Sequence, residues 1–306
     1  MSKIDYATAD IMLVDHDLNT RQSVKNILHD LGFRDIRQGK SLEEIKRVLG
    51  KHMPDLLIAS CELKDGDFID FIRDIRQGNA GNNPFIPIIT LIENPTPELV
   101  TRVVESGTDT VIAKPISTAQ MIDRVTDMID SRKKFVVSEN YIGPARRKDQ
   151  AGGGIEAPNT LHAKINGEKL SYSEIEAMIN DAMAEVQAAR VDVIGLQISA
   201  RVTNLVPMLE RAGRLDPTIR QELLSLLDIT DGSADKLADS KYEHVTELCE
   251  AVGNVASAIL ASRGGTPDVK DVRLLKPLSQ AIQACFSGAI TNAQQVSAIV
   301  QQIGIR

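Results

Sequence analysis

Short apolar runs alternate with amphipathic stretches from the start of the chain to about residue 132. The apolar runs are short enough for strands, and the stretches between them show helical periodicity. Five strand–helix units in this order predict a doubly wound α/β domain with a five-stranded parallel sheet. The predicted strands are 11–14, 35–38, 56–59, 86–92 and 111–113, and the predicted helices are 20–31, 42–49, 67–76, 97–106 and 118–129.

Polar residues follow three of the predicted strands. Asp15 follows the first strand, Ser60 the third and Lys114 the fifth. In doubly wound sheets, sites form beyond the carboxyl ends of the strands. We therefore expect these three side chains to meet at one site.

Residues 133–170 lack sustained periodicity and are predicted to be a linker. They include Gly143-Pro144, the run 151–154 (Ala-Gly-Gly-Gly) and the triplet 157–159 (Ala-Pro-Asn), all typical of loops. Residues 141–148 form a small patch of aromatic and basic residues. We interpret the segment as a solvated tether, and the alternative is a peptide that docks on a partner or on the first domain.

From residue 171 onward the apolar spacing is helical, and residues 171–306 are predicted to form an all-helical bundle domain. The first helix carries a coiled-coil-like seam with alternating four- and three-residue steps. A second stripe with Ile194 and Ile198 widens its apolar face, and Pro207 should kink or end it. The seam contains Ile175, Ile179, Ala182, Val186, Ala189, Val193, Leu196, Ala200 and Thr203.

Length, charge and cysteine content limit the possible functions. A chain of 306 residues suits two domains, and its apolar runs are shorter than the roughly 20 residues that span a bilayer. Neither a signal-peptide core nor a disulfide or zinc pattern is present, so we expect a cytoplasmic protein without membrane contact. Net charge is −7, of which about −5 lies from residue 151 onward, and this argues against nucleic-acid binding.

The first domain, residues 1–132, resembles a bacterial response-regulator receiver domain. The resemblance covers roughly residues 9–131, and its motifs are specific only when taken together. It implies a flavodoxin-like sheet, a cis peptide before Pro115 and a place in two-component or phosphorelay signalling. It rests on Leu13-Val14-Asp15, Pro54-Asp55-Leu56-Leu57-Ile58, Ile86-Pro87-Ile88-Ile89 and Gly107 through Lys114-Pro115.

The positions that carry the chemistry of the family differ in this chain. An active receiver needs a carboxylate nucleophile after strand three, and acidic residues after strand one to hold Mg²⁺. Here the nucleophile position is Ser60, and the acidic pair aligns on Asp15 and His16. Asp17 lies one position too far along the chain to replace the missing acid. We therefore expect no cofactor and no Mg²⁺ binding.

The residues that read the phosphoryl group in receivers are also replaced. The strand-four hydroxyl position aligns on Ile92, with Thr90 two residues earlier, and the aromatic switch position aligns on Val111. Lys114 and Asp15 are retained, and we expect them to form a salt bridge. The resemblance thus implies a pseudo-receiver that is not phosphorylated.

Two alternatives remain open at this point. A displaced acid in the loop after Ser60, Glu62 or Asp65, could take over the metal or the phosphoryl group, although we read both as solvated loop acids. The helical domain could be a chemotaxis-type phosphatase, in which an acid and an amide on one helix face orient water. The candidate pairs are Glu176 with Asn180 and Glu250 with Asn254.

Other histidines in the chain do not suggest chemistry. His244 would need a lysine three positions on to resemble a phosphotransfer histidine, and that position is Glu247. We read His244 as an ordinary surface residue, and His162 as a linker residue without a partner.

We predict a signalling protein that acts through protein–protein contacts and is not an enzyme. The receiver resemblance implies a partner face built from the fourth helix, fifth strand and fifth helix. The helix that starts near Ile175 either packs within the bundle or forms a homodimer. The residues of the predicted partner face are Leu99, Arg102, Val103, Glu105, Met121 and Arg124.

Overall fold

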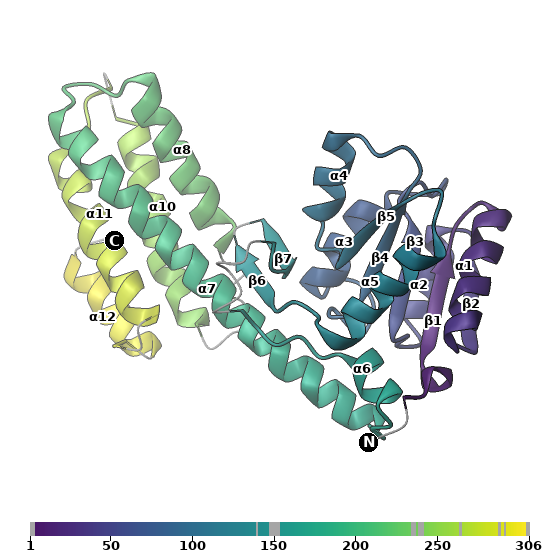
Figure 1. Cartoon of the computed structure of the whole chain (residues 1–306). Helices are drawn as coiled ribbons and strands as arrows, with labels where there is room; N and C mark the ends of the chain where they lie inside the picture. The colour runs from purple at the N-terminus through teal and green to yellow at the C-terminus, as the bar shows by residue number, and fades with distance from the viewer. Residues whose placement is uncertain are drawn as a thin grey trace. The chain divides into compact units, whose positions relative to one another are not determined.

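The computed structural model divides the chain into two compact units, residues 1–185 and 186–306. The long helix α7 (Tyr172–Arg211) contributes residues to both units (Figure 1). The structure describes residues 4–138, 140–146, 154–233, 237, 242–262, 265–286, 289–290 and 292–303.

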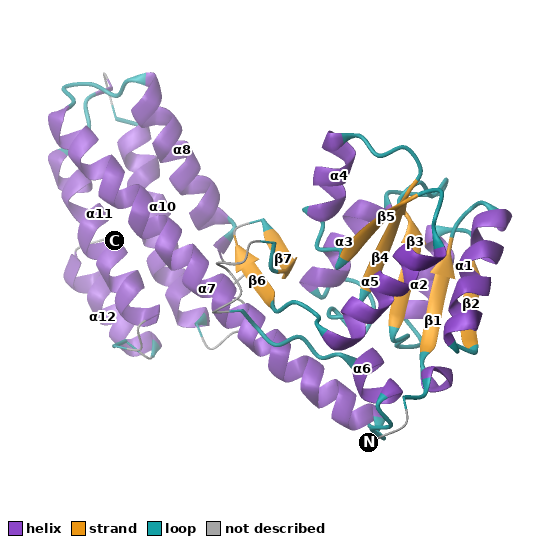
Figure 2. Ribbon diagram, in the orientation of Figure 1, coloured by secondary structure: helices purple, strands orange, loops and turns teal. Residues whose placement is uncertain are grey.

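The first unit contains the predicted five-stranded parallel sheet, with strand order β2-β1-β3-β4-β5 (Figure 2). Every residue of β3 and β4 is buried, because central strands of a parallel sheet are covered on both faces. The order reverses between β1 and β3, which places the topological switch point there. The strands are β1 (Asp10–Val14), β2 (Asp35–Gly39), β3 (Leu56–Ser60), β4 (Ile88–Ile92) and β5 (Thr110–Ala113).

Helices cover both faces of this sheet. The apolar sides of α1 and α5 share one core cluster with alternate strand residues, and those of α2 and α3 share another. Each helix follows a side-chain N-cap that accepts backbone N–H groups, which explains why the predicted starts lie within two residues of the observed ones. The helices are α1 (Leu18–Leu31), α2 (Leu42–Leu49), α3 (Phe68–Gln77), α4 (Pro97–Val104) and α5 (Thr118–Asp130), after a short 3₁₀ turn η1 (Tyr6–Thr8).

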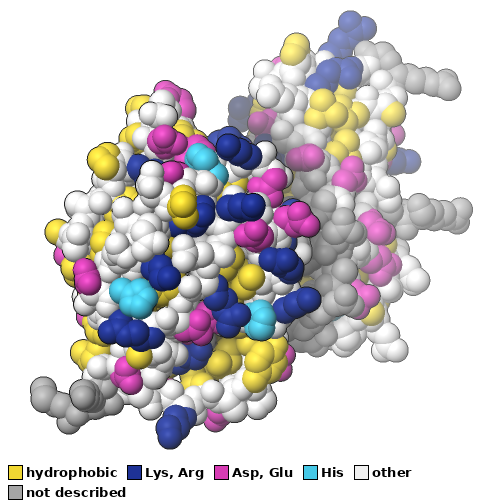
Figure 3. All heavy atoms as spheres, turned by 90° about the vertical axis from the view of Figure 1, so that its right-hand side faces the viewer, with side chains coloured by type: hydrophobic (Ala, Val, Ile, Leu, Met, Phe, Trp, Pro, Cys, Tyr) yellow, Lys and Arg dark blue, Asp and Glu magenta, His cyan; other side chains and the backbone are white. Residues whose placement is uncertain are grey.

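The outer strand β2 is polar, which suits an edge strand with one unpaired side. Arg37 of β2 pairs with Asp10 of β1, Nε to Oδ1 at 2.9 Å. Figure 3 shows Lys and Arg side chains spread over the face that α1 and β2 form, between smaller apolar areas. The peptide bond before Pro115 is cis, as the sequence predicted.

Residues 133–170 are not the solvated tether that the sequence analysis expected. Strands β6 (Phe135–Ser138) and β7 (Tyr141–Pro144) form an antiparallel hairpin, and Ile155 pairs with Phe135. Helix α6 (Thr160–Ile165) follows. We call the described residues between 133 and 167 the strap. Arg147 and Lys148 of the basic patch lie outside the described residues.

The aromatic ring of Phe135 anchors the strap in the first unit. It is fully buried between the guanidinium groups of Arg76 and Arg132, at 5.1 and 5.3 Å from its centroid, and meets Phe85 edge-on. Both arginines pair with Asp109, at 2.8 and 2.9 Å. Burial lowers the pKa of Arg76 to about 10. One carboxylate and one aromatic ring thus contact both guanidinium groups at the start of β5, and three backbone carbonyl oxygens complete the contacts of Arg76.

Two glycines allow the hairpin to approach the turn before β5 closely. Gly107 has φ +98°, and a Cβ there would lie 2.5 Å from the carbonyl oxygen of Ile142. A Cβ on Gly143 would lie 2.7 Å from the Cα of Gly107. Gly143-Pro144 is therefore a contact site, although its composition is typical of a flexible loop.

Helix α6 completes the core on the α1–α5 side of the sheet. Leu161 and Ile165 are buried in the same cluster as α1 and α5. Lys164 pairs with the buried Asp55 at 2.8 Å. His162 was predicted to have no partner, but its Nδ1 lies 2.7 Å from the carbonyl oxygen of Ile129. The alternative of docking on the first domain is therefore the one that the structure supports.

The second unit is a helical bundle, as predicted, but it begins at residue 186 and not at residue 171, because the first half of α7 belongs to the first unit. Pro207 lies inside α7 and does not end it, because the helix continues to Arg211. No helix among the described residues is both long and apolar enough to cross a membrane. Besides the second half of α7, the bundle contains α8 (Pro217–Asp231), the 3₁₀ turn η3 (Glu243–Val245), α10 (Thr246–Leu260), α11 (Val269–Phe286) and α12 (Ala293–Ile303).

Gly195 of α7 lies directly against an aromatic side chain of the bundle. A Cβ at this position would lie 2.0 Å from Cδ2 of Phe286 on α11. The Phe286 ring also packs edge-on against Tyr242 at 5.6 Å. A small residue is therefore required at position 195 for the aromatic side chain to fit.

We predict that Gly195→Ala lowers the melting temperature of the bundle. Alanine in a helix interior normally stabilises by up to about 1 kcal/mol, but the overpacking against Phe286 should cost about 1–3 kcal/mol. Differential scanning calorimetry of the full chain measures the change. Gly213→Ala is the control, since nothing lies within 4 Å of a Cβ there, and equal melting of the two variants would show that the contact with Phe286 is not tight.

We predict that Phe135→Ala detaches the hairpin from the first unit. Truncating a buried phenylalanine costs about 3–5 kcal/mol, and Arg76 and Arg132 lose their aromatic neighbour. Hydrogen exchange of residues 133–146 should accelerate strongly. Val136→Ala, at a half-buried position on the same strand, should cost only about 1 kcal/mol. Unchanged exchange in Phe135→Ala would contradict this role of the ring.

Candidate functional site

The carboxyl ends of β1, β3 and β5 bring Asp15, Ser60 and Lys114 together, as the sequence analysis expected. Lys114 Nζ lies 2.7 Å from Asp15 Oδ2 and donates to Ser60 Oγ at 3.3 Å. Asp15 and Ser60 are fully buried, and the Lys114 side chain is 11% exposed. The predicted salt bridge between Lys114 and Asp15 is present. A single ammonium group therefore joins three strand ends.

The second carboxylate oxygen of Asp15, Oδ1, is bonded within the loop that follows β1. Oδ1 accepts the backbone N–H of Asp17 at 2.9 Å, and His16 Nδ1 lies 3.6 Å away. Arg21 donates to the carbonyl oxygen of Asp15 at 2.6 Å. The buried carboxylate is thus compensated by the Lys114 ammonium group on one oxygen and a backbone N–H on the other, as a buried charge requires.

Ser60 is connected to Glu62, a residue whose role the sequence analysis missed. Ser60 Oγ donates to Glu62 Oε2 at 3.0 Å, and Glu62 Oε1 accepts the backbone N–H of Glu93 at 3.1 Å. Glu62 is half-buried and is not the solvated loop acid that was expected. Its carboxylate links the loop after β3 to the loop after β4. These hydrogen bonds connect Lys114 through Ser60 and Glu62 to the backbone of Glu93. We call these four residues the anchor network.

The other acids near the site cap helices. Asp65 accepts the backbone N–H groups of Leu42 and Glu43 at the start of α2, and these bonds lower its pKa. Asp17 accepts the hydroxyl and backbone N–H of Thr20, and its pKa is lowered as well. Both carboxylates therefore already serve as caps at the ends of helices.

The positions of the missing hydroxyl and aromatic switch are filled by apolar packing. Ile92 is fully buried in a cluster with Ile69 of α3 and Val103 of α4. Val111 packs against the same cluster. Thr90 is also buried, and its hydroxyl lies 2.8 Å from that of Thr108. Apolar side chains from β4 and β5 thus pack against α4 at the two positions that the sequence analysis aligned with the switch residues.

The residues present do not fit a Mg²⁺ site. Mg²⁺ prefers hard oxygen ligands, but Asp15 is paired with an ammonium group and the next residue, His16, offers an imidazole nitrogen. Ser60 contributes a neutral hydroxyl already bonded to Glu62. Within the described ranges, no group of three or more His, Cys, Asp or Glu side chains is arranged to hold a metal ion.

Two residues of the predicted partner face are buried, and the sequence analysis was wrong to include them. Val103 and Met121 are fully buried, because they occupy the core-facing positions of α4 and α5. Leu99 is half-buried. Arg102 is exposed and paired with Asp67. The exposed members that remain are Arg102, Glu105 and Arg124.

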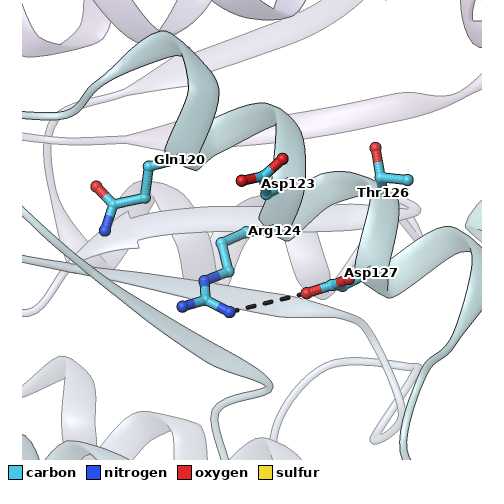
Figure 4. Close-up of a pocket in the computed structure, with 5 residues that line it drawn as sticks. All are labelled: Gln120, Asp123, Arg124, Thr126 and Asp127. Carbon is cyan, nitrogen blue, oxygen red and sulfur yellow. Dashed lines mark ion pairs between the residues drawn. The ribbon is translucent and has the colours of Figure 1, made fainter.

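The outer side of α5 carries an open hollow of about 530 Å³ (Figure 4). Arg124 points toward Asp127, Nη1 to Oδ2 at 3.7 Å. A smaller hollow of about 200 Å³ includes the same two residues together with Asp109 and Lys133. This surface mixes both signs of charge, and neither hollow is lined by residues of the anchor network. The first hollow is lined by Gln120, Asp123, Arg124, Thr126 and Asp127.

The candidate residues of the helical part lie on separate helices. His244 is half-buried on η3, with its ring 6.5 Å from that of Tyr242, so it is not the plain surface residue that was expected. The phosphatase-type pairs are exposed: Glu176 and Asn180 on α7, and Glu250 and Asn254 on α10.

Known proteins are similar to the first unit. Residues 11–126 match the model of the response regulator receiver domain. The KDP operon transcriptional regulatory protein KdpE of Escherichia coli (strain K12) is 26% identical over 115 residues, which is 38% of this chain and 48% of KdpE. The phosphate regulon transcriptional regulatory protein PhoB of the same organism is 24% identical over 129 residues, 42% of this chain and 55% of PhoB. The chain thus spans about half the length of the curated relatives it matches.

Solved receiver structures are also similar. A CheY-like receiver domain protein from Methanospirillum hungatei JF-1 covers 40% of this chain and 95% of its own, at 18% identity and a TM-score of 0.37. Residues 11–126 are a receiver domain of the kind found in two-component response regulators.

We predict that Lys114→Met destabilises the first unit by about 3–5 kcal/mol, because it leaves the Asp15 carboxylate buried without its cation. Asp15→Asn should cost less, since Lys114 can reach solvent. The double variant should recover most of the loss, because both groups are then neutral. Calorimetric unfolding of the four proteins gives the coupling between the two sites. Additive effects of the two substitutions would contradict a stabilising pair.

Proposed function

We propose that the receiver domain is a pseudo-receiver, which takes part in two-component or phosphorelay signalling by binding partner proteins and has no phosphorylation cycle. The observation that carries the proposal is the bond from Ser60 to Glu62 at the nucleophile position. A receiver forms an acyl phosphate on a carboxylate, and a serine hydroxyl cannot form that bond. The protein would then act by recognition and would not be an enzyme.

Electrostatics supports the same conclusion. A phosphoryl donor carries several negative charges, and in an active receiver Mg²⁺ and lysine offset them. Here the carboxylate of Glu62 lies 3.0 Å from the hydroxyl that would have to react. Lys114 is engaged with Asp15. An anionic donor would therefore meet a negative group in place of a metal ion.

The packing around α4 supports a fixed conformation. In receivers that switch, a hydroxyl and an aromatic side chain move when the phosphoryl group arrives. Ile92 and Val111 have no polar atom that could follow such a group, and their cluster joins α4 to the sheet. The surface that partners meet would then be constitutive. Its exposed charges, Arg102, Glu105 and Arg124, suit a protein partner with a mixed-charge face.

We predict that acetyl phosphate does not label the wild-type chain and that beryllofluoride does not change its hydrogen exchange. Intact-mass spectrometry after incubation with Mg²⁺ and acetyl phosphate measures the first effect. Stoichiometric labelling, or a shift in exchange around α4, would overturn the proposal. Peptide mapping would then show whether Asp65 is the displaced acceptor.

A gain-of-function variant provides the matched control. Ser60→Asp restores the nucleophile, and His16→Asp restores the second acid for Mg²⁺. We expect labelling of this double variant at residue 60, with release in hydroxylamine as an acyl phosphate requires. Glu62→Ala in the same background should increase labelling by removing the nearby negative charge. Ser60→Ala should behave like the wild type.

A further inference from the structure

Along the second half of α7, the heptad seam is left uncovered by the bundle. Leu196 is 66% exposed, Ala200 and Thr203 are exposed, and Ala189 and Val193 are half-buried. The bundle instead buries the opposite side of the helix. We call these five seam residues the α7 strip. The buried residues opposite are Val191, Ile194, Ile198, Val202, Leu205 and Leu209.

The first half of the same seam is not available to a partner. Ile175, Ile179 and Ala182 are buried within the first unit, and Val186 is buried as well. A homodimer through the helix starting near Ile175, one of the two alternatives of the sequence analysis, therefore cannot use that end. Among the seam residues, those after Val186 are half-buried or exposed.

We propose that the α7 strip pairs with the same strip of a second copy as a parallel two-stranded coiled coil. In heptad terms, Val193 and Ala200 occupy a positions, and Ala189, Leu196 and Thr203 occupy d positions. A β-branched residue at a with leucine at d favours parallel dimers. This proposal does not depend on whether the receiver is phosphorylated.

Charges beside the strip support a second copy and the parallel orientation. Arg190 occupies an e position, and Glu185 occupies the g position five residues before it. In a parallel coil, Glu185 of one copy lies beside Arg190 of the other, twice by symmetry. In an antiparallel coil, Arg190 would lie beside the other e positions, Gln197 or Asn204, which are uncharged.

Arg190 has no partner within the part of the chain that the structure describes. It is half-buried, makes no ion pair or hydrogen bond there, and burial lowers its pKa. Glu185 is exposed. A half-buried cation normally has a counter-charge or a hydrogen-bond acceptor, and the second copy would supply one. Further along α7, polar side chains do have partners in the bundle: Arg201 pairs with Glu222 of α8 at 2.9 Å, and Ser199 accepts from Gln283 of α11.

Sedimentation velocity of the full chain tests whether the dimer exists. The strip is short, so we expect a weak interface with a Kd in the micromolar range, on the order of ten micromolar. The sedimentation coefficient should rise between about 1 and 200 µM. A coefficient that stays at the monomer value over this range would overturn the proposal.

Charge reversal tests the orientation. Arg190→Glu places two acidic pairs across a parallel coil and should raise the Kd about tenfold. Combining it with Glu185→Arg exchanges the charges and should return the Kd to within about threefold of the wild type. An unchanged Kd for Arg190→Glu would overturn the pairing, and so would a double variant that is as weak as the single one.

Disulfide cross-linking tests the register. Thr203 at the end of the strip faces its own copy in a parallel coil but lies near Ala189 in an antiparallel one. Thr203→Cys should therefore form dimers at least about tenfold faster than the control Leu224→Cys, whose side chain on α8 is 58% exposed. Equal rates would overturn the proposal. The native cysteines should not interfere, since Cys249 and Cys285 are buried and burial raises the pKa of Cys61 to about 12.

Discussion

The buried ion pair between Lys114 and Asp15 is the constraint on which the receiver site depends. A carboxylate with no exposure must have a counter-charge, and the lysine provides it while also bonding Ser60. Through Ser60 and Glu62 the same network reaches the loop after β4. In an active receiver the phosphoryl group and its metal would make connections of this kind only transiently. Here the carboxylate of Glu62 makes such a connection from within the chain, through its bonds with Ser60 and with the backbone of Glu93.

A second charged cluster lies at the start of β5, where it compensates a buried cation. Arg76 is buried completely and is satisfied by Asp109, by three carbonyl oxygens and by the ring of Phe135. The strap supplies that ring, so the segment after α5 belongs to the domain and is not a connection between domains. The strap also reaches the surface beside α5, since Lys133 and Pro144 line the smaller hollow with Arg124.

The sequence predicted the sheet, its helices and the frame of three polar strand ends because strong local patterns set them. Apolar runs identify β1, β3 and β4, and N-caps mark the helix starts. It did not predict the strap, because two four-residue strands that contain glycine and proline have the composition of a loop. Only the fold reveals that Arg76 and Gly107 contact these strands. Glu62 was missed for a similar reason, since only the fold brings the backbone of Glu93 to its carboxylate. Val103 and Met121 were misassigned because a helix face cannot be chosen until the sheet beneath it is known.

Helix α7 shows why periodicity does not identify a partner. One heptad pattern runs through its seam, yet Ile175 and Ile179 are buried within the first unit while Leu196 and Ala200 are exposed. The second stripe, with Ile194 and Ile198, enters the bundle core. A helix that is apolar on two sides needs two partners, and the bundle accounts for one of them. The uncovered side carries the half-buried Arg190 next to the α7 strip, and the proposed pairing with a second copy would satisfy both the apolar and the charged requirement.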